Sequence, residues 1–356
     1  MRPLVVYLDQ NIWVKLLRAK VGGEHQEVGD LLGAMQQAVR DGIAIFPLSG
    51  AHYMETWHRR KETSRLALAE LMKSLSGFAT IAPAQLAFRK ESEQILNAIL
   101  RGAHPDQVSS YDGSDWVIGH GVDHAFDSPT GRLRIVESVA TKEAPEGREL
   151  QPPRELLELI GELKRRFPAG YEWWSLSGEG IEFPDDGFEL HTQHRRGDEY
   201  VDEQNRLAAS IADARASGME PRDVVVAQYG YWLYNSLLDL AASKGVDLRL
   251  VAGWLVENYP SLTGVRLLID QAAPTSSVAL ALTWEKHRNP QWGWNQHDLA
   301  DITSLSVAGA YADVVVTERQ WAHALVASGA AKRWNTRATA KLSELSQILD
   351  SHDLSQ

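Results

Sequence analysis

The chain has 356 residues, of which 44% are hydrophobic and 23% are charged, and its formal net charge at pH 7 is −11. This composition is typical of a globular protein with at least one large core. Cysteine is absent, which excludes disulfides, thiolate metal sites and a cysteine nucleophile. No apolar run approaches the roughly 18 residues of a membrane span, and Asp9 interrupts the apolar N-terminal stretch too early for a signal peptide. We therefore expect a cytoplasmic protein without membrane contact.

The first hundred residues alternate between predicted strands and helices. Residues 3–8 form a short run rich in Val and Leu, typical of a buried parallel strand, and a helix is expected over 12–20. Ser49 follows a second predicted strand at 42–48 and is a candidate N-cap for a short helix. Further helices are predicted from apolar spacing over residues 27–42, 61–75 and 83–100.

The texture changes near Gly102. Residues 103–190 are rich in Gly, Pro, Asp and Ser, with one helix expected around 153–166, and helical patterns return over 198–258 and 276–289. We interpret residues 103–285 as a mainly helical lobe inserted into an α/β core. The two parts of that core are residues 1–102 and 286–356.

The C-terminal region returns to alternating patterns. A helix is predicted over 298–311, a strand over 312–317 and a helix over 318–329, followed by a short strand near 337–340 and a last helix over 341–349. Alternation of buried strands with helices at both ends of the chain predicts an α/β fold with a central, mostly parallel sheet.

Carboxylates occupy the positions where an open α/β sheet binds its ligands, outside the carboxyl ends of strands. Asp9 follows the first strand, Glu55 lies soon after the second, Asp298 and Asp301 open one helix, and Glu318 follows the strand 312–317. Hard cations such as Mg²⁺ and Mn²⁺ prefer oxygen ligands, and clustered carboxylates bind them next to phosphates. Each acid has an ordinary alternative role as an N-cap, a first-turn acid or part of a solvated helix face.

Taken together, three segments resemble the PIN-domain nucleases. They are VVYLDQN with Asp9, SGAHYMETW with Glu55, and DLADITSLSVAGAYADVVVTERQW, in which Asp301 starts a helix, Ala308 packs it and Thr317 ends the strand. The resemblance covers roughly residues 1–100 and 290–356. It implies a three-layer fold around a mostly parallel sheet, with the activity of an Mg²⁺- or Mn²⁺-dependent endoribonuclease.

The resemblance also implies roles for single residues. Asp9, Glu55 and Asp301 would bind the metal, and Asn11 and Thr317 would orient these carboxylates from behind. The sequence departs from the family pattern at Arg319, where an Asp or Asn is usual, so the remaining ligand is Asp298 or Glu318. We expect Asp298 within the acidic cluster and Glu318 at its rim. The segment between Glu55 and Asp301 is a second departure, because it is far longer than the compact helical region that the family has there.

A net negative charge is unusual for a nucleic-acid enzyme, because phosphate neutralisation dominates binding. Local basic clusters are the candidate RNA contacts, although each is more often a solvated helix face. The main candidates are Arg59, Arg60, Lys61 and Arg319, and further clusters include Arg65, Lys164, Arg165, Arg166, Arg195, Arg196, Lys332, Arg333 and Arg337. Trp292 and Trp294 could stack on unpaired bases, but packing is the more common use. The run of His52, Glu55 and His58 has no zinc-protease spacing, and these histidines are expected to be core or surface residues.

Two other functions remain open on the sequence. A non-catalytic PIN-like scaffold that binds a partner is favoured by Arg319 and the net charge, and a structure-specific DNA nuclease would use the same carboxylates. A ribonuclease of this kind could act as a toxin with a protein inhibitor, in phage defence or in RNA processing. The sequence does not choose among these roles or give the substrate or the oligomeric state.

Overall fold

The computed structural model describes residues 2–22, 26–108, 114–128, 153–180 and 188–353. Its fold is mixed α/β and mostly helical, built around a four-stranded parallel sheet with the order β2-β1-β5-β6. The strands are β1 (Leu4–Leu8), β2 (Ala44–Ile45), β5 (Val314–Val316) and β6 (Arg337–Thr339). The central pair, β1 and β5, joins the two ends of the chain, with Leu8 paired to Val316.

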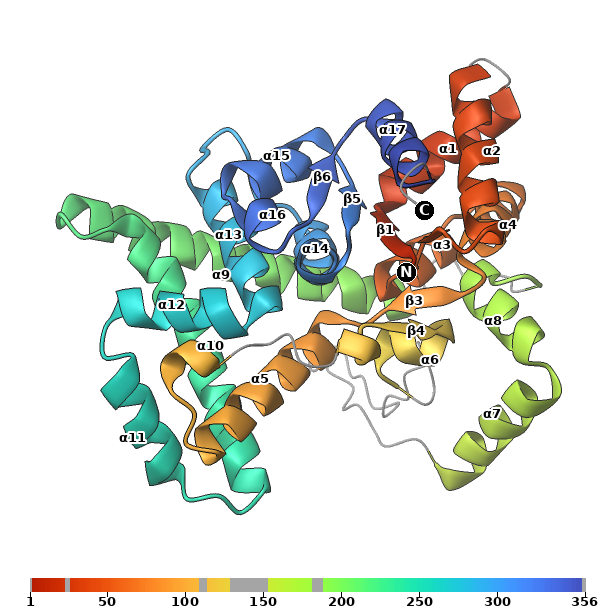
Figure 1. The fold of residues 1–356 in the computed structure, drawn as a ribbon. Coiled ribbons are helices and arrows are strands. Elements are labelled where there is room, and N and C mark those ends of the chain that lie inside the picture. The colour runs from red at the N-terminus through yellow and green to blue at the C-terminus, as the bar shows by residue number, and fades with distance from the viewer. Residues whose placement is uncertain (1, 23–25, 109–113, 129–152, 181–187, 354–356) are drawn as a thin grey trace.

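Helices cover both faces of this sheet, because successive strand side chains point to opposite sides. Val6 and Leu8 pack into one core and Val5 and Tyr7 into another. The first core is completed by α1 (Gln10–Gly22), α2 (Gln26–Arg40), α4 (Glu62–Ser76) and α17 (Leu342–Asp353). The second is completed by α13 (Pro274–His287), α14 (Asp298–Tyr311), α15 (Arg319–Ala327) and α16 (Ala330–Arg333). Figure 1 shows these two groups of helices on either side of the strands.

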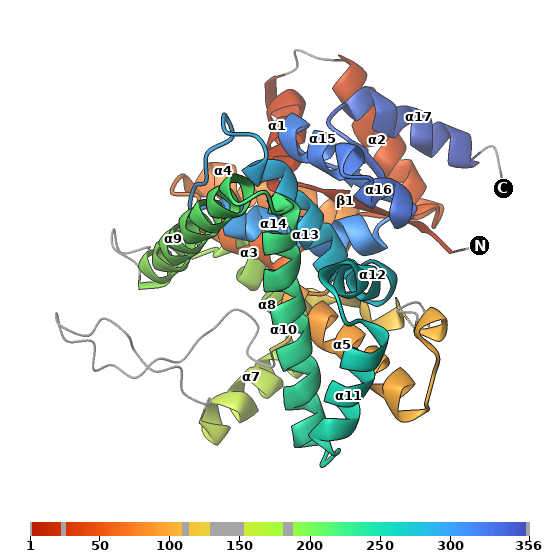
Figure 2. The ribbon, with the colours of Figure 1, turned by 90° about the vertical axis from the view of Figure 1, so that its left-hand side faces the viewer.

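A third core lies beside the sheet and is formed mainly by helices. It joins α5 (Ala84–Leu100) to α10 (Pro221–Ser243), α11 (Leu248–Asn258), α12 (Leu262–Ala272) and part of the long α9 (Phe188–Ala216). Figure 2 shows α5, α10, α11 and α12 packed together below the sheet. The remaining elements are α3 (Gly50–Trp57), β3 (Ala79–Ile81), the short helices Pro105–Gln107 and Ser114–Trp116, β4 (Ile118–His120), α6 (Gly121–Phe126), α7 (Arg154–Arg166) and α8 (Pro168–Ser177).

Most of the elements predicted for the two ends of the chain are present. The strands expected at 3–8, 312–317 and 337–340 correspond to β1, β5 and β6, and the helix expected over 298–311 has the same bounds as α14. The strand predicted at 42–48 is only two residues long. Pro47 follows it closely and has no N–H with which to extend the ladder. The sequence patterns did not predict β3, β4, α6 or α8.

The described residues of the segment 103–285 contribute β4 to a separate antiparallel pair with β3 and no strand to the parallel sheet. Their helices pack in two places. Helix α8 contacts α3 and α4, next to the sheet. Helix α10 instead contacts α5, α12 and α13. Within the described residues, no helix is both long enough and apolar enough to cross a membrane.

Candidate functional site

Asp9 lies at the carboxyl end of the sheet because β1 ends at Leu8 and α1 begins at Gln10. Its backbone N–H donates to Val316 O at 2.9 Å, which aligns it with the end of the neighbouring strand β5. Thr317 follows β5 and donates its hydroxyl to Asp9 Oδ2 at 2.7 Å, while the Gln10 N–H donates to Asp9 Oδ1 at 2.7 Å. Thr317, which the resemblance assigned to orient a carboxylate, thus contacts the Asp9 carboxylate directly.

Glu55 reaches the same edge from α3, the helix that follows β2. Ser49 is the N-cap of α3, as expected, and its backbone N–H donates to Nδ1 of His52 at 2.8 Å. His52 is fully buried, and burial lowers its pKa to about 4, so the ring is neutral and serves as a helix cap. Glu55 follows three residues later on the same helix face. The cap therefore sets where Glu55 meets the sheet.

Asp301 comes from the first turn of α14. This helix leads into β5, so its N-terminus lies at the carboxyl end of the parallel strands. The Trp321 indole N–H donates to Asp301 Oδ2 at 3.1 Å. Ser304, one turn further along α14, faces the same side of the helix.

Asp9, Glu55 and Asp301 line one small pocket of about 10 Å³, close to the space that a single water or ion fills. None of the described residues that line it is Lys or Arg. The other lining residues are Tyr7, Gln10, Ala51, His52, Ala300, Ser304 and Leu305.

Each of the three carboxylates has a raised pKa. Burial is the first cause at Asp9, against the hydrogen bonds from Thr317 and Gln10. Burial and the charge of Asp9 raise the pKa of Asp301 to about 7. Glu55 keeps exposed surface, yet partial burial and the charges of Asp301 and Asp9 raise its pKa as well. The site concentrates negative charge that a bound cation would relieve.

The donor chemistry of this pocket fits a hard divalent cation, since it offers carboxylate oxygens and no competing lining cation. The distances between the carboxylates, however, are not those of a formed metal site. Within the described part of the chain, no group of three or more His, Asp or Glu side chains is already arranged to hold a metal ion. Coordination by Asp9, Glu55 and Asp301 together therefore requires side-chain rotation around the ion.

Asp298 does not complete this set, contrary to our expectation. It is buried, and its Oδ1 accepts from Lys286 Nζ at 2.7 Å while its Oδ2 accepts from the Asn295 N–H at 2.6 Å. Both oxygens are thus bound by the protein, and Asp298 is not among the pocket-lining residues. The reason is a tertiary contact, since Lys286 comes from the preceding helix, α13.

Glu318 lies outside the lining residues and is exposed. Its charge nevertheless raises the pKa of Asp9 and Asp301, which places it near both. Asn11 donates to Glu318 Oε1 at 2.5 Å, so Asn11 holds Glu318 and not a pocket carboxylate. Arg319 is exposed at the first position of α15.

Several of the basic side chains are engaged within the protein. Arg65 is buried and donates to the backbone carbonyls of Ser177, Gly178 and Arg59. Lys164 pairs with Asp123, Arg165 and Arg166 with Glu162, Arg195 with Glu199, and Arg333 with Asp270. By contrast, Arg60, Lys61 and Arg319 are exposed and Arg59 is half-buried, with one N–H donated to Ser64. These four remain the candidates for contacts with RNA.

The sequence analysis missed Tyr7, Gln10, His52 and Ser304 as residues of the site. Tyr7 was part of the apolar strand and therefore resembled core; its hydroxyl lies 3.3 Å from Ser49 Oγ. Ser304 could have been found, because it lies one helical turn after Asp301. Trp292 and Trp294, considered as base-stacking residues, instead surround the Lys286 ammonium.

Comparison of the chain with known protein families, with characterised proteins and with solved structures gave no match.

Proposed function

We propose that this protein is a metal-dependent nuclease that cleaves RNA phosphodiester bonds, and that its α/β part is PIN-like. The observation that carries the proposal is the convergence of Asp9, Glu55 and Asp301 on one pocket from three separate segments. The three segments are the end of β1, helix α3 and the start of α14. They are the same three that resemble the PIN-domain nucleases in sequence.

In this proposal Asp9, Glu55 and Asp301 hold Mg²⁺ or Mn²⁺. Such an ion, when bound, activates a water molecule and stabilises charge on a phosphodiester. The chain's own contribution is pre-positioning. Thr317 and Gln10 fix both oxygens of Asp9, and Trp321 fixes one oxygen of Asp301. Because burial raises the pKa of Asp9 and Asp301, protons and a divalent cation would compete for these carboxylates.

RNA is favoured over DNA by the family resemblance, and the exposed Arg60, Lys61 and Arg319 are proposed to contact its phosphates. Glu318 is proposed to lie at the rim of the site, where its carboxylate would orient a water molecule. We propose that the segment 103–285 selects the substrate or a protein partner.

The test is cleavage of single-stranded RNA, tRNA and single-stranded DNA by the purified protein, with Mn²⁺ and with a chelator. We expect Mn²⁺-dependent cleavage of RNA that Asp9→Asn and Asp301→Asn abolish. Asp30→Asn, an acid on α2, is the matched control and should cleave like the wild type. Preference for DNA would replace the substrate in this proposal. Absence of both cleavage and Mn²⁺ binding would instead favour a non-catalytic scaffold.

A further inference from the structure

Lys286 is a charged side chain in the interior. Its side chain has no exposed surface, and that of Asp298 is 3% exposed. A buried ammonium is strongly unfavourable unless it is paired and hydrogen-bonded. The Lys286–Asp298 pair at 2.7 Å satisfies that condition.

Three tryptophans complete the surroundings of Lys286. Its Nζ lies 4.6 Å from the ring centre of Trp292, 5.0 Å from that of Trp294 and 5.2 Å from that of Trp321. Aromatic faces attract a cation most strongly where water is excluded. The rings of Trp292 and Trp321 also contact each other, with their centres 4.5 Å apart. We call Lys286, Asp298 and these three tryptophans the lysine cage.

Trp321 joins the lysine cage to the carboxylate pocket. Trp321 is 3% exposed, and its indole N–H donates to Asp301 Oδ2. One face of this indole is therefore held by the Lys286 ammonium while its N–H holds a pocket carboxylate. Trp292 contacts the same ammonium, but its indole has no such bond to Asp301 among those of the described residues.

We infer that Lys286 is a positioning residue for Asp301. Held by Asp298 and the cage, it fixes the Trp321 ring so that the indole N–H holds Asp301 Oδ2 and turns the other carboxylate oxygen toward the pocket. Asp298 thus acts as the counter-ion of this device, not as a metal ligand. The inference rests on the proposed function, because the purpose of holding Asp301 is to hold it ready for a divalent cation.

A matched pair of substitutions separates this role from simple packing. Trp321→Phe keeps a ring over Lys286 and removes the N–H donor to Asp301, whereas Trp292→Phe makes the same chemical change without touching that hydrogen bond. The readout is the Mn²⁺ dissociation constant, measured by electron paramagnetic resonance of free Mn²⁺ below the melting temperature of each variant. We expect about tenfold weaker Mn²⁺ binding in Trp321→Phe, as for loss of a residue that orients a metal ligand. Trp292→Phe should change it less than about threefold, since it weakens only a cation–π contact.

The charge itself is tested by removing both partners at once. Lys286→Met alone would leave Asp298 as an unpaired buried charge and could unfold the protein. The double variant Lys286→Met/Asp298→Asn is neutral and avoids this. We expect it to fold, as judged by circular dichroism, and to bind Mn²⁺ about tenfold more weakly, because Trp321 is no longer held.

The outcomes of these experiments are distinct. Wild-type Mn²⁺ affinity in both Trp321→Phe and the double variant, alongside its loss in Asp301→Asn, would overturn the positioning role and leave the proposed nuclease intact. Equal weakening by Trp292→Phe and Trp321→Phe would also overturn it, since cage packing would then be the cause. No Mn²⁺ binding by the wild type would overturn the proposed function and this inference together.

Discussion

Asp9 has a hydrogen bond at each carboxylate oxygen, one from Gln10 N–H and one from the Thr317 hydroxyl. Both bonds favour the charged form, whereas burial and the charge of Glu318 oppose it, and the net effect is a raised pKa. The hydrogen bond from the Thr317 hydroxyl therefore keeps the pKa of Asp9 lower than burial alone would. Its removal should raise the pKa of Asp9 further.

Thr317→Val tests this hydrogen bond with little change in shape. We expect the free energy of unfolding to fall by about 1–3 kcal/mol, because a buried carboxylate oxygen loses its donor. We also expect the acidic limb of the cleavage rate against pH to move to higher pH. Urea unfolding and the pH–rate profile measure the two effects. Thr317→Ser retains the hydroxyl and should keep both close to wild type; a shift as large as that of Thr317→Val would contradict this role.

The carboxylates of the pocket destabilise one another when no cation is present. Asp301→Asn removes one charge and keeps the acceptor for Trp321, so we expect no cleavage together with a higher melting temperature in metal-free buffer at pH 8. The stabilisation should be roughly 2 kcal/mol, because Glu55 no longer faces the charge of Asp301. Calorimetry with chelator measures it. Glu318→Gln, at the exposed rim, should raise the melting temperature less; a lower melting temperature in Asp301→Asn would contradict charge crowding.

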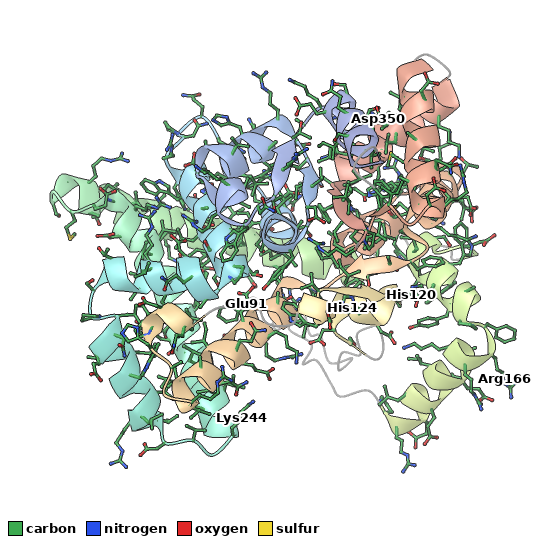
Figure 3. The ribbon with its side chains drawn as sticks, viewed as in Figure 1. Glu91, His120, His124, Arg166, Lys244 and Asp350 are labelled. Carbon is green, nitrogen blue, oxygen red and sulfur yellow. The ribbon has the colours of Figure 1, made fainter. Side chains whose placement is uncertain are left out.

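At the scale of elements, Glu91 on α5 (labelled in Figure 3) links three helices. Its Oε1 accepts from the Thr275 N–H at the start of α13, at 2.9 Å, and from the Tyr311 hydroxyl at the end of α14, at 2.8 Å. Burial raises the pKa of Glu91 to about 7. The carboxylate thus joins the helical core to the helix that carries Asp301.

At pH 8, Glu91→Gln and Glu91→Ala should change the free energy of unfolding in opposite directions. The folded-state pKa of about 7 lies above the ordinary value of 4.5. The contribution of Glu91 to the free energy of unfolding is therefore complete below pH 4.5 and is lost as pH rises through 7. Gln keeps an acceptor without the charge and should match or exceed the wild type at pH 8. Ala leaves the Thr275 N–H unpaired and a cavity, costing about 2–4 kcal/mol. Denaturant unfolding at pH 5 and pH 8 measures both; a wild-type pH dependence in Glu91→Gln would contradict the assignment.

Between two helices, Arg65 has an equally specific structural role. Its guanidinium on α4 donates to the carbonyls of Ser177 and Gly178 at the end of α8, at 2.6 and 3.4 Å. We expect Arg65→Met to lower the free energy of unfolding by about 3 kcal/mol, because buried carbonyls lose their donors. Thermal unfolding measures this. Arg60→Met, at a neighbouring exposed position, is the control and should be near neutral, while equal effects would show that burial is not the cause.

For the whole molecule, titration of buried groups predicts how stability depends on pH. Burial raises the pKa of Asp301 and Glu91 to about 7 and lowers that of His52 and His287 to about 4. The contribution of the two histidines to the free energy of unfolding is lost as pH falls below 6.5. The contribution of the two carboxyl groups is lost as pH rises from about 4 through 7. These trends oppose each other in the acid range. Above pH 6.5 only the decline from the carboxyl groups remains.

The metal-free protein should therefore lose melting temperature between pH 6.5 and 8. Mn²⁺ binding should restore it at pH 8, by about 1.4 kcal/mol for each tenfold excess of Mn²⁺ over its dissociation constant. At pH 5 the effect should be smaller, because Asp301, whose pKa is about 7, is protonated there. Scanning calorimetry with and without Mn²⁺ measures this, with Asp9→Asn/Asp301→Asn as the control that should not respond. An equal Mn²⁺ effect in that variant would place binding elsewhere.

Local sequence determined much of the α/β part of this protein. Buried runs of Val and Leu specify β1 and β5, and helical spacing with acids in the first turn specifies α14 over its full length. Asp9, Glu55 and Asp301 were predicted because each follows a strand or opens a helix, and parallel strands bring such positions to one edge. These relations depend on local periodicity and on sheet topology.

Tertiary structure alone decided the contacts of Asp298 and the existence of the short strands β3 and β4. Asp298 lies in the first turn of α14, as Asp301 does, but its partner Lys286 comes from α13. A lysine near the end of a helix usually lies in solvent, so the sequence did not predict this buried pair. Weak strands such as β3 and β4 carry too few residues for a recognisable period, and they exist because they pair with each other. Sequence periodicity shows which face of an element is apolar. It does not show which distant charge will be buried against it, because that depends on the free energy of desolvation in the assembled core.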